Sequence, residues 1–233
     1  MVRCHTFGAD MGFEVETKDC TAVTDAELGE LESLSVDSPN ALSMGVLSKQ
    51  TEEWVLLTTA RENGKLSGYV FYTLERIGGT PAVIMGLGSV MRNNRRNATL
   101  KALMNELYHR ALMAFPDEDV IFGTTILSPS GLEVFKDLTD ELPKPSYRPS
   151  GEERAWGRRF AKRLGFSPLG FDDKKFIAVG DGSKPCVFDH ESLKPEKIDN
   201  DLLGMFLDLD HESGDAMVAV AWAMAEKLEK LGS

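Results

Sequence analysis

Hydrophobic and polar positions repeat with two different periods along this chain, and the periods predict where strands and helices lie. Residues 13–17 (FEVET) alternate apolar and polar side chains, which is typical of a half-buried strand. After Asp25, Leu28, Leu31 and Leu34 recur at helical spacing and predict a helix. The breaker-rich stretch 35–40 ends it, and residues 44–54 are expected to form a second short helix.

Three β-rich runs follow at 54–60, 66–74 and 82–91. The first two are joined across Asn63 and Gly64, a pair that tolerates positive φ angles and is the strongest short signal of a hairpin. The second and third are joined across Gly78 and Gly79. The pattern predicts an antiparallel meander of three strands.

A helix and a buried strand are expected next. Apolar residues recur three, four and seven positions apart on one helix face: Leu100, Leu103, Met104, Leu107, Ala111 and Leu112. Asn97 or Thr99 is a suitable N-cap for this helix. Residues 119–127 form a nearly continuous apolar run, which indicates a strand buried on both faces. A strand, helix, strand succession of this length predicts a right-handed crossover between parallel strands.

The last hundred residues have weaker patterns. We expect a helix within 130–142, a proline-rich loop at 143–149, a basic helix at 152–164, a strand at 174–179 and a short apolar piece at 186–188. Residues 189–215 carry nine acidic residues against two lysines. Two helical patterns, at 202–209 and 216–231, complete the chain. We therefore divide it into a lead-in (1–12), a main domain (13–189) and an acidic helical C-terminal appendage (190–233).

Composition narrows the function classes. The formal net charge is −11, which argues against general nucleic-acid or anionic-membrane binding. Three cysteines without a CxxC pair fit reduced thiols, and neither a secretory signal nor a transmembrane run is evident. The four histidines are scattered, and an Asp208–Gly214 stretch fails the calcium-loop pattern, so we expect no metal. These features favour a cytoplasmic protein.

The expected order of elements resembles the GCN5-related N-acetyltransferase (GNAT) family, and a motif carries the resemblance further. In that family, a valine at the end of the fourth strand is followed five residues later by R-x-x-G-x-[GA] and then by a leucine pair. Here Val90 is followed in register by Arg95, Arg96, Asn97, Ala98, Thr99 and Leu100, and then by Leu103 and Met104. The resemblance implies an α/β (or α+β) fold with a mixed, twisted sheet and helices on both faces.

The motif has a physical basis, because backbone N–H groups at a helix N-terminus favour an anion. In the family the anion is the pyrophosphate of acetyl-CoA, and the backbone of strand four pairs with the pantetheine arm. The resemblance therefore implies a cofactor site of Gly88, Ser89, Val90, Arg95, Arg96, Asn97, Ala98, Thr99 and Leu100. Ala98 and Leu100 stand where the family has glycine or a small residue. The Leu100 side chain either crowds a phosphate or turns into the core.

No catalytic residue is assigned from the sequence. The family's general-acid tyrosine falls at Ala161, which precedes a matching Gly165-Phe166 pair and cannot transfer a proton. Tyr147 lies in an insertion, and Glu75 ends the second strand of the meander as the nearest carboxylate to a strand-four base. A solvated strand end is the alternative role of Glu75.

The resemblance implies an N-acyltransferase that moves an acetyl or other acyl group from acyl-CoA to the amine of a small-molecule or peptide acceptor. The alternative is a catalytically degenerate GNAT-like module that binds a CoA-type ligand or a protein partner without turnover. The acidic C-terminal helices are then an interaction surface or a homodimer contact.

Overall fold

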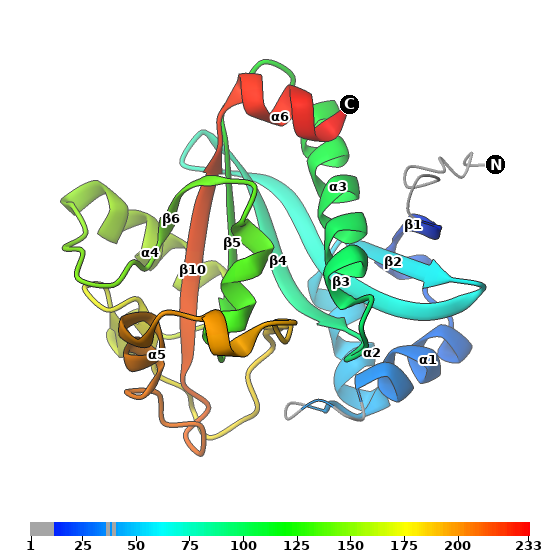
Figure 1. Cartoon of the computed structure of the whole chain (residues 1–233), viewed down its shortest axis with the longest axis horizontal. Helices are drawn as coiled ribbons and strands as arrows, with labels where there is room; N and C mark the ends of the chain where they lie inside the picture. The colour runs from blue at the N-terminus through cyan, green and yellow to red at the C-terminus, as the bar shows by residue number, and fades with distance from the viewer. Residues whose placement is uncertain (1–11, 36–37, 39–40) are drawn as a thin grey trace.

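The computed structural model describes residues 12–35, 38 and 41–233 and shows one mixed β-sheet with helices on both faces (Figure 1). The predicted lead-in up to residue 11 and residues 36–37 and 39–40 of the predicted break lie outside the described residues. The predicted fold class, a mixed sheet covered on two sides, is confirmed.

The sheet has the order β1-β2-β3-β4-β5-β10-β8-β7, with β6 paired to β10 and β9 paired to β4. Its strands are β1 (Phe13–Asp19), β2 (Leu56–Glu62), β3 (Lys65–Ile77), β4 (Thr80–Val90), β5 (Val120–Ile126), β6 (Thr139–Leu142), β7 (Phe171–Asp172), β8 (Ile177–Ala178), β9 (Phe188–Asp189) and β10 (Ala216–Ala223). Two neighbouring pairs are parallel, β4 with β5 and β4 with β9, and the others are antiparallel.

Two hydrophobic cores lie on the two faces of this sheet. One core holds the apolar side chains of α3 (Arg96–Ala114), α5 (Asn200–Phe206) and α6 (Ala225–Gly232). The other holds those of α1 (Asp25–Ser35), α2 (Met44–Glu53) and α4 (Gly151–Arg163). Figure 1 shows α3 and α6 together at one side and α4 at the far side of the central strands. Each helix is amphipathic because it buries one stripe against the sheet.

The predicted meander is confirmed as β2, β3 and β4. Asn63 has φ 51° and Gly64 φ 76°, so both central residues of the β2–β3 turn occupy the left-handed region. This is the turn whose twist matches a hairpin, and only glycine and asparagine-like residues adopt it readily. The predicted helices at α1 and α2 and the predicted strands at β1 and β5 are also confirmed.

The helix expected over 216–231 is wrong. Residues Ala216–Ala223 form β10, which lies between β5 and β8 and pairs with β5 from Met217–Ile126 to Ala223–Val120. Only Ala225–Gly232 is helical there. The run AMVAVAWA is buried on both faces, so it shows no alternation, and its alanines favour a helix until strand pairing overrides that preference. The part expected as a helical appendage, 190–233, therefore contributes a central strand to the sheet.

Three smaller expectations are also corrected. Residues 130–142 contain a 3₁₀ turn (Pro129–Phe135) and β6 instead of a helix, and the 174–179 strand shortens to β8. Helix α3 begins at Arg96 with Arg95 as its N-cap, so neither Asn97 nor Thr99 caps it. Thr99 lies in the first turn, fully buried beside Gly68, and its hydroxyl donates to the Arg95 carbonyl 3.4 Å away.

Candidate functional site

The parallel strands β4 and β5 separate soon after they meet. They pair only from Ala82–Ile121 to Ile84–Gly123. Beyond that point β4 continues along β3 as far as Val90, while β5 continues along β10. Two parallel strands that separate leave backbone donors and acceptors facing each other across a slot, which another extended backbone can use.

The chain itself fills this slot with β9. Gly88 pairs with Phe188 and Ser89 pairs with Asp189, and the Gly88 N–H donates to the Val187 carbonyl at 3.2 Å. On the opposite side the Thr125 hydroxyl of β5 donates to the Cys186 carbonyl at 2.9 Å. The backbone at 186–189 is thus bound to both strands.

Gly88 is the residue that lets β9 approach. A Cβ added at Gly88 would lie 2.6 Å from Cδ2 of Phe188, well inside van der Waals contact. The Phe188 ring is 1% exposed and belongs to the core under α3. A glycine in the middle of a strand is expected where another group comes close, and here that group is the Phe188 ring.

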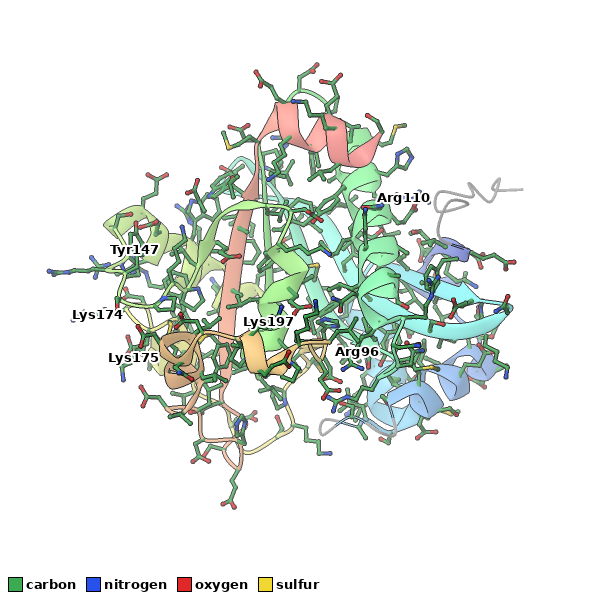
Figure 2. All side chains as sticks on the ribbon, viewed as in Figure 1. Arg96, Arg110, Tyr147, Lys174, Lys175 and Lys197 are labelled. Carbon is green, nitrogen blue, oxygen red and sulfur yellow. The ribbon has the colours of Figure 1, made fainter. Side chains whose placement is uncertain are left out.

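Residues 189–192 continue from β9 across the start of α3. The Asp189 carboxylate accepts hydrogen bonds from Arg92 Nη2 at 3.1 and 3.3 Å, and the Ser192 carbonyl accepts one from Arg96 Nη2 at 3.0 Å. Glu191 lies 3.8 Å from the same guanidinium of Arg96. Figure 2 shows Arg96 at the N-terminal end of α3, where this part of the chain passes. Two arginines therefore hold the segment that follows β9.

His190 anchors the same stretch through a second contact. Its Nε2 lies 3.0 Å from Oε2 of Glu133. Burial lowers the pKa of His190, with Arg96 adding to this and with Glu133 and Asp189 opposing it. Burial alone would raise the pKa of Glu133, but hydrogen bonds from Ser192 and His190 lower it overall. The pair consequently favours a neutral imidazole and an ionised carboxylate. The stretch of chain from Cys186 to Ser192, which contains β9, is called the 186–192 segment.

The residues predicted to bind a cofactor lie together at the end of β4 and the start of α3. Gly88 and Ser89 are engaged by β9, and Val90 is buried in the core under α3. The Leu100 side chain is 1% exposed in that same core, so it turns inward and leaves the loop clear. Arg95 extends outward, donating from Nε to Glu62 at 2.9 Å. Ala98 packs against the core with part of its surface open.

Several polar atoms around this site are buried without a hydrogen-bond partner in the described part of the chain. They are Tyr69 Oη, Arg92 Nε, Arg96 Nε, Asn97 Oδ1 and His190 Nδ1. Burial is the main cause that raises the pKa of the Tyr69 phenol, and the nearby Asp189 and Cys186 raise it further. The hydroxyl therefore stays protonated. A buried polar atom without a partner is costly, and a bound ligand or water would supply partners for these.

The proton-transfer candidates from the sequence lie elsewhere. Glu75 pairs across the sheet with Ala82, at the opposite end of β4 from Gly88, and accepts hydrogen bonds from Arg163 Nε at 3.0 and 3.2 Å. Tyr147 is 46% exposed, and its hydroxyl donates to Glu153. Figure 2 shows Tyr147 at the side of the molecule away from Arg96. Ala161 is buried in the core under α4.

A cavity of about 570 Å³ opens next to the 186–192 segment, on the α2 and α4 side of the sheet. Its walls are the end of α2, the turn after α4 and the loop 179–186, and Cys186 contributes to its lining. Trp54 and Phe166 give it apolar walls, while Glu53 and Asp181 place two carboxylates there. Burial and then the Glu53 charge raise the pKa of the Cys186 thiol to about 11, so this sulfur is a thiol at neutral pH.

No group of three or more histidine, cysteine, aspartate or glutamate side chains in residues 12–35, 38 and 41–233 is arranged to hold a metal ion. None of the helices within these residues combines the length and apolar character needed to cross a bilayer.

Comparisons with known proteins find similarity only among solved structures. Neither a family model nor a curated protein sequence matches it. Among solved structures it is similar to an aminoglycoside 6′-acetyltransferase of type Ii, at 13% identity and a TM-score of 0.41, over 55% of this chain and 86% of that one. It is also similar to the ribosomal-protein-S18-alanine N-acetyltransferase of Escherichia coli, at 10% identity and a TM-score of 0.41, over 89% and 92%.

A third similar structure is a GNAT family acetyltransferase of Brucella melitensis in complex with acetyl-CoA. The identity is 14% and the TM-score 0.34, over 46% of this chain and 74% of that one. Many such matches are acetyltransferases, and all three described here lie at low identity.

The position of the 186–192 segment between β4 and β5 could not be predicted from the sequence. Its apolar part is only three residues long, and its partners on β4 lie about a hundred positions earlier in the chain. The usable signal is charge: Asp189 and Glu191 follow the short apolar piece, and the basic loop that contains Arg92 and Arg96 contrasts with the acidic chain.

Proposed function

We propose that this chain is an acyl-CoA-dependent N-acyltransferase, which moves an acetyl or other acyl group to the amine of an acceptor without a metal ion. The observation that carries the proposal is the separation of β4 from β5 after three paired residues, with the arginine-bearing start of α3 at its mouth. The sequence motif that runs from Val90 to Leu100 supports the same function by its resemblance to the GNAT pyrophosphate turn.

In this proposal, the backbone of Gly88, Ser89 and Val90 aligns the pantetheine arm. The diphosphate lies at the first turn of α3, beside Arg95, Arg96, Asn97, Ala98 and Thr99, where the helix dipole and the guanidinium groups favour an anion. Leu100 supports the turn from the core.

The residues present fit such a ligand in one specific respect. The Nε atoms of Arg92 and Arg96 are buried and unpaired within the described chain, and a phosphate offers acceptors to guanidinium groups. Because β9 holds the Gly88 N–H, an acyl-CoA can use the slot only in exchange for β9.

The acceptor side is assigned to the cavity beside Cys186. Its two carboxylates, Glu53 and Asp181, outnumber its one cation, Lys184, and favour a cationic amine on a small molecule or peptide. The neutral amine attacks the thioester carbonyl, a C–N bond forms, the C–S bond breaks and CoA leaves as the thiol. Before the attack, the cationic amine gives one proton to solvent, and the second proton that the nitrogen loses is taken up through solvent by the departing sulfur. No base is assigned, because Glu75 and Tyr147 lie away from the slot.

The test combines binding with turnover. Urea unfolding is measured with acetyl-CoA, with CoA and with acetyl-pantetheine, which lacks the diphosphate. At a hundred times its Kd, acetyl-CoA should add about 2.7 kcal/mol to the free energy of unfolding. Acetyl-pantetheine should stabilise the protein less at equal concentration if the α3 arginines bind the diphosphate. Thiol release is then followed across a panel of polyamines, amino sugars and peptides.

The outcomes separate the two functions considered from the sequence. Thiol release that depends on an amine supports an acyltransferase. Stabilisation by acetyl-CoA without release for any acceptor would instead favour a module that binds CoA-type ligands without turnover. If millimolar acetyl-CoA leaves the unfolding curve unchanged, both ligand-dependent functions are refuted.

A further inference from the structure

We infer that the 186–192 segment is a built-in competitor of the acyl-CoA, an intramolecular occupant that must leave the slot before the ligand enters. This inference rests on the proposed function, because it assigns to the segment the binding groups that an acyl-CoA would use. It adds a control step to the chain: the fraction of molecules with an open slot sets the apparent affinity for the ligand.

The backbone of the segment occupies the position of a pantetheine arm. An extended chain lies between β4 and β5, accepts the Gly88 N–H at Val187 and accepts the Thr125 hydroxyl at Cys186. These are the contacts that an amide-containing arm would make with the same two strands. The two occupants cannot both pair with Gly88, because one N–H makes one strong hydrogen bond.

The charged half of the segment occupies the position of the diphosphate. Asp189 is bound by Arg92, and Glu191 and the Ser192 carbonyl approach Arg96. Carboxylates and phosphates are recognised by the same guanidinium geometry, so two side-chain anions stand where two phosphates would. The segment therefore reproduces the order of the ligand, a neutral extended arm followed by negative charge.

The fit of the segment is incomplete, which is why we assign it as an exchangeable occupant. Tyr69 is fully buried, and its hydroxyl has no hydrogen-bond partner beside Asp189 and Cys186. Arg92 and Arg96 each leave Nε unpaired. A ligand with carbonyl and phosphate oxygens would offer acceptors to these donors, which the segment does not.

The effect of the segment on the apparent Kd for acyl-CoA depends on the fraction of molecules in which the slot is open. When only a fraction of molecules has an open slot, the apparent Kd equals the intrinsic Kd divided by that fraction. Each tenfold destabilisation of the closed segment should therefore tighten acyl-CoA binding tenfold until the open state dominates.

Two variants and one control test this by isothermal titration with acetyl-CoA. Asp189→Asn removes the carboxylate charge that Arg92 binds, and Phe188→Ala removes the ring that fixes β9 beneath Gly88. Glu196→Gln removes one negative charge from an exposed position of the same part of the chain, outside the contacts of the segment. We expect the apparent Kd to fall about fivefold or more in Asp189→Asn and about tenfold or more in Phe188→Ala, with Glu196→Gln unchanged.

Hydrogen exchange of the unmodified chain gives a second readout that needs no variant to fold. With saturating acetyl-CoA, the amides of 186–192 should exchange faster than in the free protein, while those of β5 and β10 stay protected. If acetyl-CoA binds the unmodified protein and all three variants with equal affinity and leaves 186–192 protected, the inference is overturned. The proposed function would still stand. Absence of binding in every chain would overturn the proposed function, and with it the role of the segment as a competitor.

Discussion

Replacing Gly88 by alanine should destabilise the protein by pressing a methyl group against the Phe188 ring. The added Cβ would lie 2.6 Å from Cδ2 and 2.8 Å from Cε2 of that ring, and 3.1 Å from the Tyr69 carbonyl. Real carbon contacts are about a full ångström longer than the first two, so the ring has to move within a packed core. Overpacking of this kind costs about 1–3 kcal/mol.

The assignment of that cost to Phe188 is tested by a double-mutant cycle. Phe188→Leu shortens the side chain and makes room for the methyl group, so Gly88→Ala should cost less in the Phe188→Leu background. We expect a coupling of about 1 kcal/mol or more, measured by urea unfolding followed by tryptophan fluorescence. Gly86→Ala is the matched control, because its Cβ would lie 2.2 Å from the Trp54 ring and should not couple to Phe188→Leu.

If Gly88→Ala and Phe188→Leu add to within about 0.5 kcal/mol, the Phe188 ring does not press on Gly88 in solution. The placement of β9 in the slot would then be wrong, whatever ligand the protein binds.

Three further predictions concern other parts of the molecule. Leu100→Ala should lower the free energy of unfolding by about 2–5 kcal/mol because Leu100 is a core residue, and an unchanged urea midpoint would show that its side chain points into the loop instead. Ser150→Ala should cost about 1 kcal/mol, since it removes the capping box of α4, and Ser150→Asp should restore most of that loss in the same denaturation assay. The pKa of His190 is lowered by burial, so the native chain binds fewer protons than the unfolded chain below about pH 6.5, and stability should decline as the pH falls from 6.5. The lowered pKa of Glu133 affects stability only at more acidic pH. His190→Gln should therefore flatten the plot of unfolding free energy against pH between pH 8 and 5.5. An equal slope in the unmodified protein and the variant would contradict the assignment to His190.

The parts of the fold that could be predicted are those encoded by neighbouring residues. The β2–β4 meander follows from alternation and from the Asn63-Gly64 turn, whose positive φ angles few other residue pairs adopt easily. The face of α3 follows from the spacing of its leucines. These features need no information from distant parts of the chain.

The parts that were missed depend on distant partners. β10 is a strand because β5 and β8 offer edges on either side of it, and its own residues carry no period of two. The 186–192 segment is likewise defined by its contacts with Gly88 and Thr125 and with the two arginines, Arg92 and Arg96, at the start of α3. In the candidate site, the sequence located the end of β4 and the start of α3, but it could not show that another segment of the chain lies between them.

The position of β10 also sets an order of events during synthesis. Val220 pairs with Gly123, so β5 is made almost a hundred residues before the strand that covers its outer edge. Until Ala223 has been made, β5 presents an apolar edge that can pair with another chain. Contacts this far apart in sequence slow folding, so we expect the nascent protein to be most prone to aggregation while it waits for β10.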